Sequence, residues 1–257
     1  MSPAVPQNLR DFFLEHNKIA LAFSGGVDSA YLLYAALQSG ARVTAYYAET
    51  EFQPEFERRD ARMLARSLGA EMRVIPLEAL KDERVAKNGP ERCYFCKHNL
   101  FSALIQAARA DGFSEIMDGT NASDDALDRP GMRALQEMKV LSPLRSCGLH
   151  KARIRALSKE AGLFTFDKPA YACLATRIPT GTAIEPGALQ RVERAEAALM
   201  EMGFSDLRVR IRGGLGLIQL PGAQLKRAME IREQILGALG RDFEQVALDL
   251  NPRPKEK

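Results

Sequence analysis

The stretch KIALAFSGGVDSAYLLYAAL, residues 18–37, decides the fold class of this chain. It opens as an apolar strand, turns through Ser-Gly-Gly at 24–26, and continues as a helix opened by Asp28 and Ser29. Glycines let the backbone approach an anion closely, and a helix N-terminus presents unpaired N–H groups and the positive end of its dipole. The Asp28 carboxylate can bind Mg²⁺ on phosphate oxygens. We therefore predict a phosphate site formed by Ser24, Gly25, Gly26, Asp28 and Ser29.

Strands and helices alternate through the first two thirds of the chain. The expected strands are 18–23, 42–48, 71–77, 115–119 and 138–142, and the expected helices lie near 28–39, 54–69, 95–111 and 149–162. This alternation is typical of a Rossmann-like α/β fold, a parallel sheet covered by helices on both faces. Ligands of such sheets bind beyond the carboxyl ends of the strands. The tripeptide Asp118-Gly119-Thr120 follows one of these ends, so we add Gly119 to the phosphate site and expect Asp118 to position a ribose or Mg²⁺.

The rhythm changes at residue 166. The segment FDKPAYACLATRIPTGTAIEPG, residues 166–187, contains three prolines and has no period, which indicates a long structured loop, and such loops are usually functional. A small α+β domain follows, with helices at 187–203 and 222–239 and strands at 206–212, 215–220 and 244–250. We expect two domains, residues 1–180 and residues 181–257.

Composition and charge narrow the class of protein. The chain has 257 residues, of which 46% are hydrophobic, and a formal net charge of +3, too small and too evenly spread to favour nucleic acid. No apolar run approaches the ~20 residues of a membrane span, and the N-terminal segment lacks the order of a signal peptide. Four cysteines in such a chain indicate a reducing cytoplasm, where cysteines bind metals or act in catalysis more often than they form disulfides.

Three cysteines are candidates for one site. Cys93 and Cys96 form a C-x-x-C pair at the start of a predicted helix, and Cys173 in the long loop is the natural third ligand. Three thiolates fit a [4Fe–4S] cluster with one iron left open, or a zinc site completed by His98. A redox-active dithiol and three unconnected thiols are the other interpretations. We expect Cys147 to be structural.

The sequence SGGVDS resembles the PP-loop of the ATP pyrophosphatase superfamily. It differs from the Walker loop, which places a lysine on the terminal phosphates for transfer of the γ-phosphoryl group. The resemblance implies that ATP binds with pyrophosphate as the leaving group while a substrate oxygen attacks the α-phosphorus. The resulting adenylate then loses AMP to a nitrogen or sulfur nucleophile.

A narrower resemblance covers residues 8–250. The segments DGTNASDD, RPGMRAL, HKARIRALSKEAGL and KPAYACLATRIPTG resemble the LarE family of ATP-dependent sulfur transferases, and the last is the most specific. The resemblance implies that the substrate is pyridinium-3,5-biscarboxylic acid mononucleotide, whose carboxylates become thiocarboxylates during nickel-pincer cofactor biosynthesis. It also implies a homohexamer assembled through the small domain, with no nucleic acid or membrane partner.

The family has two sulfur chemistries. In one, a loop cysteine attacks the acyl adenylate, and elimination then leaves the sulfur on the substrate and dehydroalanine in the protein. In the other, three cysteines hold a [4Fe–4S] cluster that carries an extra sulfide. The C-x-x-C pair together with Cys173 resembles the cluster version, with Cys93, Cys96 and Cys173 as ligands and sulfur-transfer residues. Sacrificial donation by Cys173 is the alternative.

Cationic side chains are candidates for binding the anionic substrate and ATP. Arg177 can hold a phosphate or a carboxylate, and Arg208 and Arg210 alternate on a predicted strand and therefore point to one face. That face is either an anion site or a solvated surface. Lys151 and Arg155 lie one helical turn apart and are either ATP ligands or surface charges.

Three other functions fit this sequence less well than sulfur transfer to a small molecule. PP-loop tRNA thiolases also combine such a loop with cysteines, but they need a basic path for RNA, which the interspersed charges of this chain do not suggest. Synthases that use ammonia leave the three cysteines unexplained. A nucleotide-sensing module leaves Cys173 and the arginines without a role.

Overall fold

A computed structural model describes residues 5–124 and 130–253. Asp125 and Arg129, which belong to two of the motifs quoted above, lie outside these residues. The chain forms two compact units, each of which is described by itself. The first comprises 1–79 and 91–168, and the second comprises 80–90 and 169–257. The segment between two elements of the first unit, residues 80–90, therefore packs with the C-terminal part of the chain, as does the loop that carries Cys173.

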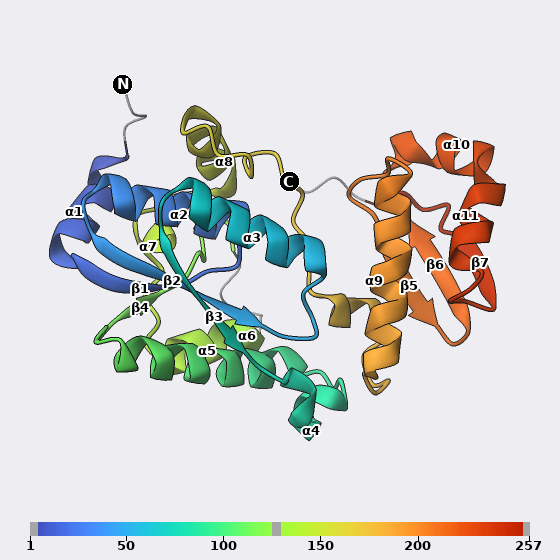
Figure 1. Ribbon diagram of the computed structural model, residues 1–257, viewed down its shortest axis with the longest axis horizontal. Coiled ribbons are helices and arrows are strands. Elements are labelled where there is room, and N and C mark those ends of the chain that lie inside the picture. The colour runs from blue at the N-terminus through green and yellow to red at the C-terminus, as the bar shows by residue number, and fades with distance from the viewer. Residues whose placement is uncertain (1–4, 125–129, 254–257) are drawn as a thin grey trace. The chain divides into compact units, whose positions relative to one another are not determined.

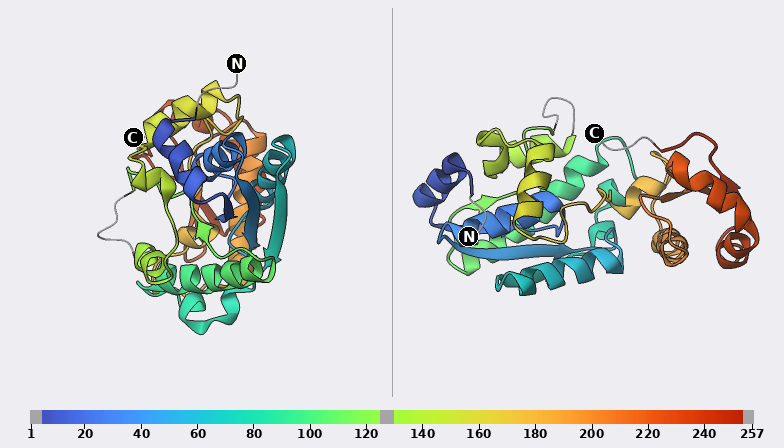
Figure 2. Two further views of the ribbon diagram at one scale, coloured as in Figure 1. Left: turned by 90° about the vertical axis from the view of Figure 1, so that its left-hand side faces the viewer. Right: turned by 90° about the horizontal axis from the view of Figure 1, so that it is seen from above.

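The first unit contains a parallel sheet of four strands. The strands are β1 (Lys18–Ala22), β2 (Arg42–Glu49), β3 (Glu71–Pro76) and β4 (Ile116–Met117), in the order β3-β2-β1-β4. Helices lie on both sides of this sheet (Figures 1 and 2). The Rossmann-like α/β fold predicted from the sequence is confirmed.

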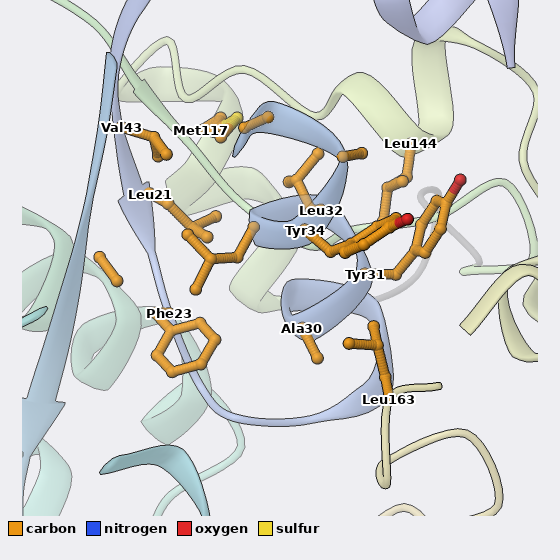
Figure 3. Close-up of a cluster of buried hydrophobic side chains, with 14 of the residues drawn as sticks. Leu21, Phe23, Ala30, Tyr31, Leu32, Tyr34, Val43, Met117, Leu144 and Leu163 are labelled. Atoms are coloured by element: carbon orange, nitrogen blue, oxygen red, sulfur yellow. The ribbon is translucent and has the colours of Figure 1, made fainter. Parts of the chain in front are cut away.

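Successive side chains of the strands supply two separate cores. Ile19 and Leu21 of β1 pack beneath α2 (Val27–Gln38), whereas Ala20 packs with Leu104 of α5 (Arg92–Ala110) on the opposite face. Figure 3 shows the larger cluster, in which side chains from β1, α2 and later segments interlock. Because both faces are buried, the central strands are almost entirely apolar, as is usual in parallel sheets.

The remaining helices of the first unit complete these two layers. The face of α2 also carries α1 (Gln7–Glu15), α3 (Glu55–Ser67), α7 (Pro143–Ser146) and α8 (Lys151–Glu160). Helix α6 (Pro130–Glu137) packs beside α5. No described helix combines the length and apolar character needed to cross a lipid bilayer.

The second unit is smaller and mixes helices with a three-stranded sheet. Strand β5 (Arg208–Arg212) pairs antiparallel with β6 (Leu215–Gln219), which pairs parallel with β7 (Gln245–Leu248). The helical elements are η1 (Ala79–Lys81, whose first residue belongs to the first unit), α4 (Glu83–Ala86), η2 (Leu174–Arg177), α9 (Pro186–Glu201), α10 (Gly222–Glu230) and α11 (Arg232–Leu239). The predicted smaller α+β part is confirmed.

Two sequence predictions of elements are wrong. The strand expected at 138–142 is reduced to a single bridge between Leu141 and Met117, because Lys139 takes a left-handed φ of 55° just after α6 and α7 begins at Pro143. The helix expected at 222–239 is divided at Ile231, whose φ of −106° and ψ of 24° end α10. The described part of the chain also contains short helices, α1, α4, α6 and α7, that the sequence did not lead us to expect.

Two glycines permit close backbone approaches around the turn after β1. Gly25 has a left-handed φ of 74°, and a Cβ built there would lie 2.8 Å from Cβ of Ala61 in α3. A Cβ on Gly119, after β4, would lie 2.9 Å from the backbone nitrogen of Ser29. Helix α3, the turn and the loop after β4 can therefore approach one another closely only because these two positions lack a side chain.

Gly25→Ala and Gly40→Ala form a matched pair for measuring this packing. Gly40 has a nearly equal φ of 76°, but a Cβ added to it would meet nothing within 4 Å, so its substitution incurs only the backbone cost, roughly 1–2 kcal/mol. Gly25→Ala should cost roughly 1–3 kcal/mol more, because it also overpacks against Ala61. Urea unfolding measures both values. Equal losses of stability in the two variants would contradict the close packing at Gly25.

Candidate functional site

A pocket of about 320 Å³ lies in the first unit, at the carboxyl ends of the strands. One side is polar and the other is apolar. The polar lining includes Ser24, Gly26, Asp28, Ser29, Gln53, Lys97, Asp118, Gly119, Thr120 and Asp124, and the apolar lining includes Phe23, Tyr47, Ala48, Leu100, Phe101 and Leu104. The structure thus brings the residues assigned to the phosphate site together with Gly119. Gly25 lies beside them against α3.

Hydroxyl groups fix the shape of the glycine turn, which we define as residues 24–29. The Ser24 and Ser29 hydroxyl oxygens lie 3.1 Å apart, and the Ser24 backbone N–H donates to Ser29 Oγ at 3.3 Å. Ser29 Oγ in turn donates to the Gly26 carbonyl at 3.2 Å. No described side chain caps the N-terminus of α2, so N–H groups at the start of this helix remain available to an anion.

The Asp28 carboxylate is only partly satisfied. Its Oδ2 accepts a hydrogen bond from Lys151 Nζ at 2.6 Å, whereas its Oδ1 is buried without a partner among the described residues. Burial raises the pKa of Asp28 above 3.8, and the ammonium of Lys151 opposes this shift without cancelling it. A buried carboxylate oxygen that lacks a donor fits a divalent cation, which would supply the missing charge.

The neighbouring acidic residues have other roles in the loop after β4. Asp118 accepts hydrogen bonds from Thr120 Oγ1 at 2.5 Å and from Ser142 Oγ at 2.7 Å, and it thereby shapes the loop. Asp124 Oδ2 accepts from the Asn121 backbone N–H at 2.9 Å. Both residues line the pocket, so they limit how much negative charge a ligand can add near them.

Lys97 is a pocket residue that the sequence prediction did not assign. It projects from α5 into the lining, and a Cβ on Gly131 would lie 2.8 Å from its Cδ. Lys97 follows Cys93 by four residues on one helix face, and that spacing was the available signal. The apolar lining residues were missed because they resemble ordinary core residues.

Cys93 and Cys96 lie in the first two turns of α5, and Cys93 is exposed while Cys96 is half-buried. The start of this helix is held to α6 by Tyr94, whose hydroxyl donates to Glu137 at 2.7 Å. Within either unit, the described residues contain no group of three histidine, cysteine or acidic side chains placed around one metal ion. Cys173 belongs to the second unit, and His98 is exposed on α5.

Cys147 lies at the end of α7 in the first unit. Burial raises the pKa of its thiol, which therefore stays protonated at neutral pH. The structural role expected of this cysteine stays a prediction.

Three arginines hold the backbone around Cys173, a stretch that we call the Cys173 segment (residues 170–177). Arg208 Nη2 donates to the Ala170 carbonyl at 2.6 Å, and Arg210 Nη1 donates to the Thr176 carbonyl at 2.7 Å. Arg177 Nη1 donates to the Ala172 carbonyl at 2.8 Å and, at 3.4 Å, to that of Cys173. The arginines expected to bind an anion therefore contact the loop that carries the sulfur.

The strongest of these contacts is a buried ion pair. Arg177 and Glu196 of α9 have side chains that are 0% and 1% exposed, and they form two bonds, Nε to Oε1 at 2.8 Å and Nη2 to Oε2 at 3.0 Å. Glu196 also accepts from the Val209 backbone N–H at 2.8 Å and from the Tyr171 hydroxyl. Burial lowers the pKa of Arg177, but its hydrogen bonds to Glu196 and the attraction of the negative charge of Glu196 together outweigh this effect and raise the pKa overall.

Glu196 was also missed in the sequence. It lies four residues after Val192 and three before Leu199, both fully buried, so it interrupts the apolar stripe of α9. A charged residue in such a stripe needs a buried partner, which was the available signal.

The other cations are also bound to the protein. Burial and the nearby Arg177 lower the pKa of Arg208 to about 10, and its guanidinium lies 5.0 Å from the centre of the Tyr171 ring. Arg155 donates to the carbonyls of Phe166 at 2.8 Å and Lys168 at 3.0 Å. In this structure Arg155 therefore contacts the end of the first unit, while Lys151 contacts Asp28.

Comparison with known proteins gives relatives that span most of the chain. No family model matches it. The chain is 36% identical over 253 residues to an uncharacterised protein of Synechocystis sp., covering 95% of this chain and 92% of the relative. It is 33% identical over 238 residues to the pyridinium-3,5-bisthiocarboxylic acid mononucleotide synthase of Lactiplantibacillus plantarum, covering 91% and 86%. A tRNA-specific 2-thiouridylase of Fervidobacterium nodosum is 26% identical over 126 residues, or 40% of this chain.

Glu196→Gln should destabilise the second unit strongly. It leaves the buried Arg177 guanidinium without its counter-charge, and breaking a buried pair in this way costs about 3–5 kcal/mol. Glu83→Gln is the control, because Glu83 pairs with Lys87 on the surface of the same unit, where both side chains are at least 75% exposed. Urea unfolding should show a large loss for the first variant and no measurable loss for the second. Similar losses of stability in the two variants would contradict the conclusion that burial makes the pair of Arg177 and Glu196 important.

The pH dependence of stability should report the state of Asp28. Its folded-state pKa is raised, so its contribution to stability is present below 3.8 and is lost as the pH rises through the raised value. The unfolding free energy of the wild type minus that of Asp28→Asn should therefore fall as the pH rises above about 4. Asp249→Asn is the control: hydrogen bonds from Gln219 and Asn251 lower the pKa of Asp249, so that difference should stay flat in this range. If the difference between the wild type and Asp28→Asn instead rose with pH, the raised pKa of Asp28 would be contradicted.

Proposed function

Because this chain belongs to the LarE family of ATP-dependent sulfur transferases, we propose that its substrate is pyridinium-3,5-biscarboxylic acid mononucleotide. The product is the corresponding bisthiocarboxylic acid, made for nickel-pincer cofactor biosynthesis. The single observation that carries this proposal is the 33% identity to the L. plantarum synthase over 91% of this chain. The glycine turn and its pocket support the ATP-dependent half of the reaction, and the cysteines support the sulfur-dependent half.

The first unit performs the activation in this proposal. The pyrophosphate part of ATP binds at the glycine turn, and Mg²⁺ binds the partnerless Oδ1 of Asp28. The apolar wall of the pocket receives the base. A substrate carboxylate oxygen attacks the α-phosphorus, the bond from that phosphorus to the oxygen bridging it to the β-phosphate breaks, and pyrophosphate leaves. Mg²⁺ held by Asp28 would supply positive charge to the phosphate oxygens. Lys97, which lines the same pocket, neutralises negative charge on the α-phosphate.

The second step replaces AMP by sulfur, and we propose that a [4Fe–4S] cluster delivers it. Cys93 and Cys96 fit two ligand positions, since a spacing of three residues puts both thiols on one face of α5 near its positive end. Cys173 is the third ligand. When bound, the cluster supplies sulfide at the iron that lacks a protein ligand. Arg177, Arg208 and Arg210 hold the Cys173 segment in one conformation. Those N–H groups of the three arginines that can be released from these contacts bind the substrate anions.

Two alternative functions would each give a different result in the experiment described below. In sacrificial donation, the Cys173 thiolate displaces AMP to form a thioester, and loss of the Cα proton breaks the Cβ–S bond to give a thiocarboxylate and dehydroalanine. A tRNA thiolase would instead transfer sulfur to a nucleobase, and the 26% identity to a 2-thiouridylase supports only the wider superfamily.

We also infer from the family resemblance that the protein is a homohexamer and that it is located in the cytoplasm.

Anaerobic purification with iron and sulfide analysis should give about four irons per chain. The purified protein should release pyrophosphate from ATP with the pyridinium nucleotide and not with tRNA. A colourless chain that loses the mass of H₂S after one turnover would establish the sacrificial route, and pyrophosphate release with tRNA alone would contradict the proposed substrate.

The cysteines offer a matched comparison for this experiment. Cys93→Ala should lose iron and repeated sulfur transfer but retain substrate-dependent pyrophosphate release, because the glycine turn is unchanged. Cys147→Ala should retain all three properties, since this thiol is not assigned to the site. Repeated sulfur transfer by Cys93→Ala would exclude the cluster mechanism.

A further inference from the structure

Gln53 lies in the turn between β2 and α3, and its half-buried side chain lines the pocket of the first unit. Tyr47 and Ala48, at the end of β2, line the same pocket and belong to its apolar wall. The proposed activation step does not use Gln53. A single polar group beside an apolar wall is the kind of group that orients a ligand and gives a pocket its specificity.

The amide oxygen of Gln53 already has two hydrogen-bond donors. Its Oε1 accepts from the Thr50 backbone N–H at 2.9 Å and from Thr50 Oγ1 at 2.8 Å. The Thr50 hydroxyl is itself oriented, because its oxygen accepts from the Phe52 backbone N–H at 3.1 Å. A backbone N–H can only donate, so the amide atom that faces Thr50 must be the oxygen and not the nitrogen.

Arg58 of α3 holds the backbone of the same turn. Its Nε donates to the Gln53 carbonyl at 3.1 Å, and its Nη2 donates to the Thr50 carbonyl at 3.0 Å. The turn is therefore fixed through its backbone by Arg58 and through its side chains by Thr50. The Gln53 amide accordingly has one orientation in the pocket lining.

The amide nitrogen of Gln53 is left open to a ligand. Its Nε2 donates to no described residue, and it is not enclosed by protein as the partnerless Oδ1 of Asp28 is. Because the oxygen is occupied by Thr50, the amide offers the pocket two N–H donors and no acceptor. Such a group selects a ligand that presents a hydrogen-bond acceptor.

The position of Gln53 in the sheet indicates which part of a ligand it meets. The glycine turn follows β1, and β2 is hydrogen-bonded to β1 along its length. A nucleotide whose phosphates lie at the glycine turn can place its base beside the end of β2, where Gln53 lines the pocket. Adenine has unprotonated ring nitrogens that accept hydrogen bonds.

We propose that Gln53 is a specificity-determining residue for the nucleotide, and that its amide N–H donates to a ring nitrogen of adenine. This inference rests on the proposed function for the identity of the nucleotide as ATP. Thr50 is then a positioning residue, because its two donors keep the amide from turning over.

Binding of ATP with Mg²⁺ to the full-length chain, measured by isothermal titration calorimetry without a second substrate, tests this contact. The analogues 1-deaza-ATP, 3-deaza-ATP and 7-deaza-ATP each replace one ring nitrogen by C–H. One of them should bind the wild type about tenfold more weakly than ATP does, and it identifies the nitrogen that accepts the hydrogen bond.

Gln53→Glu is the matching variant of the protein. One carboxylate oxygen keeps both bonds from Thr50, while the other replaces the donor by an acceptor that repels the ring nitrogen. ATP should bind about tenfold more weakly or worse, and the variant should no longer prefer ATP to the analogue that the wild type rejects. Gln106→Glu is the control, because it makes the same change of charge at an exposed position of α5 in the same unit and should leave ATP binding unchanged.

Two results would overturn the proposal: equal affinity of the wild type for ATP and all three analogues, or unchanged ATP affinity in a folded Gln53→Glu variant. Loss of binding of the pyridinium nucleotide alone in that variant would also overturn it, since the amide would then contact the second substrate. A wild type that binds ATP but releases no pyrophosphate with the pyridinium nucleotide would instead refute the proposed function. The affinities for ATP and its analogues would still judge Gln53 in that case, and a wild type that binds no ATP would refute both.

Discussion

The close approach of three backbone segments at Gly25 and Gly119 is the constraint on which the first unit depends. A Cβ at either position would lie within 2.9 Å of Ala61 or Ser29, so α3, the glycine turn and the loop after β4 can meet only where side chains are absent. Asp28, Ser29 and Gly119, which lie at these approaches, line the pocket. The parallel sheet makes the arrangement possible, because it directs the ends of neighbouring strands to one edge.

The two units differ in how completely they compensate a carboxylate, which is fully buried in Glu196 and partly buried in Asp28. Glu196 accepts hydrogen bonds from Arg177, Tyr171 and the backbone of Val209, so its charge is fully compensated within the protein and fixes a loop. Asp28 has one oxygen on Lys151 and one buried oxygen without a donor among the described residues. A buried carboxylate whose hydrogen bonds and counter-charge are all supplied by the protein holds one conformation. A carboxylate that lacks some of these partners is favourable only when a ligand supplies them.

Local patterns were sufficient to predict the sheet, the glycine turn and the small α+β part, because each depends on neighbours along the chain. The prediction of a fifth strand at 138–142 was wrong. The apolar residues there match the pattern of a strand, but the positive φ at Lys139 is set by packing after α6. The contacts of Arg177 were not predictable from the Cys173 loop, since they require knowing that Glu196, 19 residues away, faces it. The inclusion of residues 80–90 in the second unit is likewise a long-range property.

The inclusion of residues 80–90 in the second unit affects how the chain folds while it is being synthesised. Asn88 leaves the ribosome 94 residues before Thr182, whose carbonyl it binds in the finished protein. At translation rates of about 5–20 residues per second, the delay is roughly 5–20 s, during which the buried Val85 and Asn88 lack their lasting surroundings. The nascent N-terminal part thus carries an insertion that stays incompletely buried until the later half emerges and covers it.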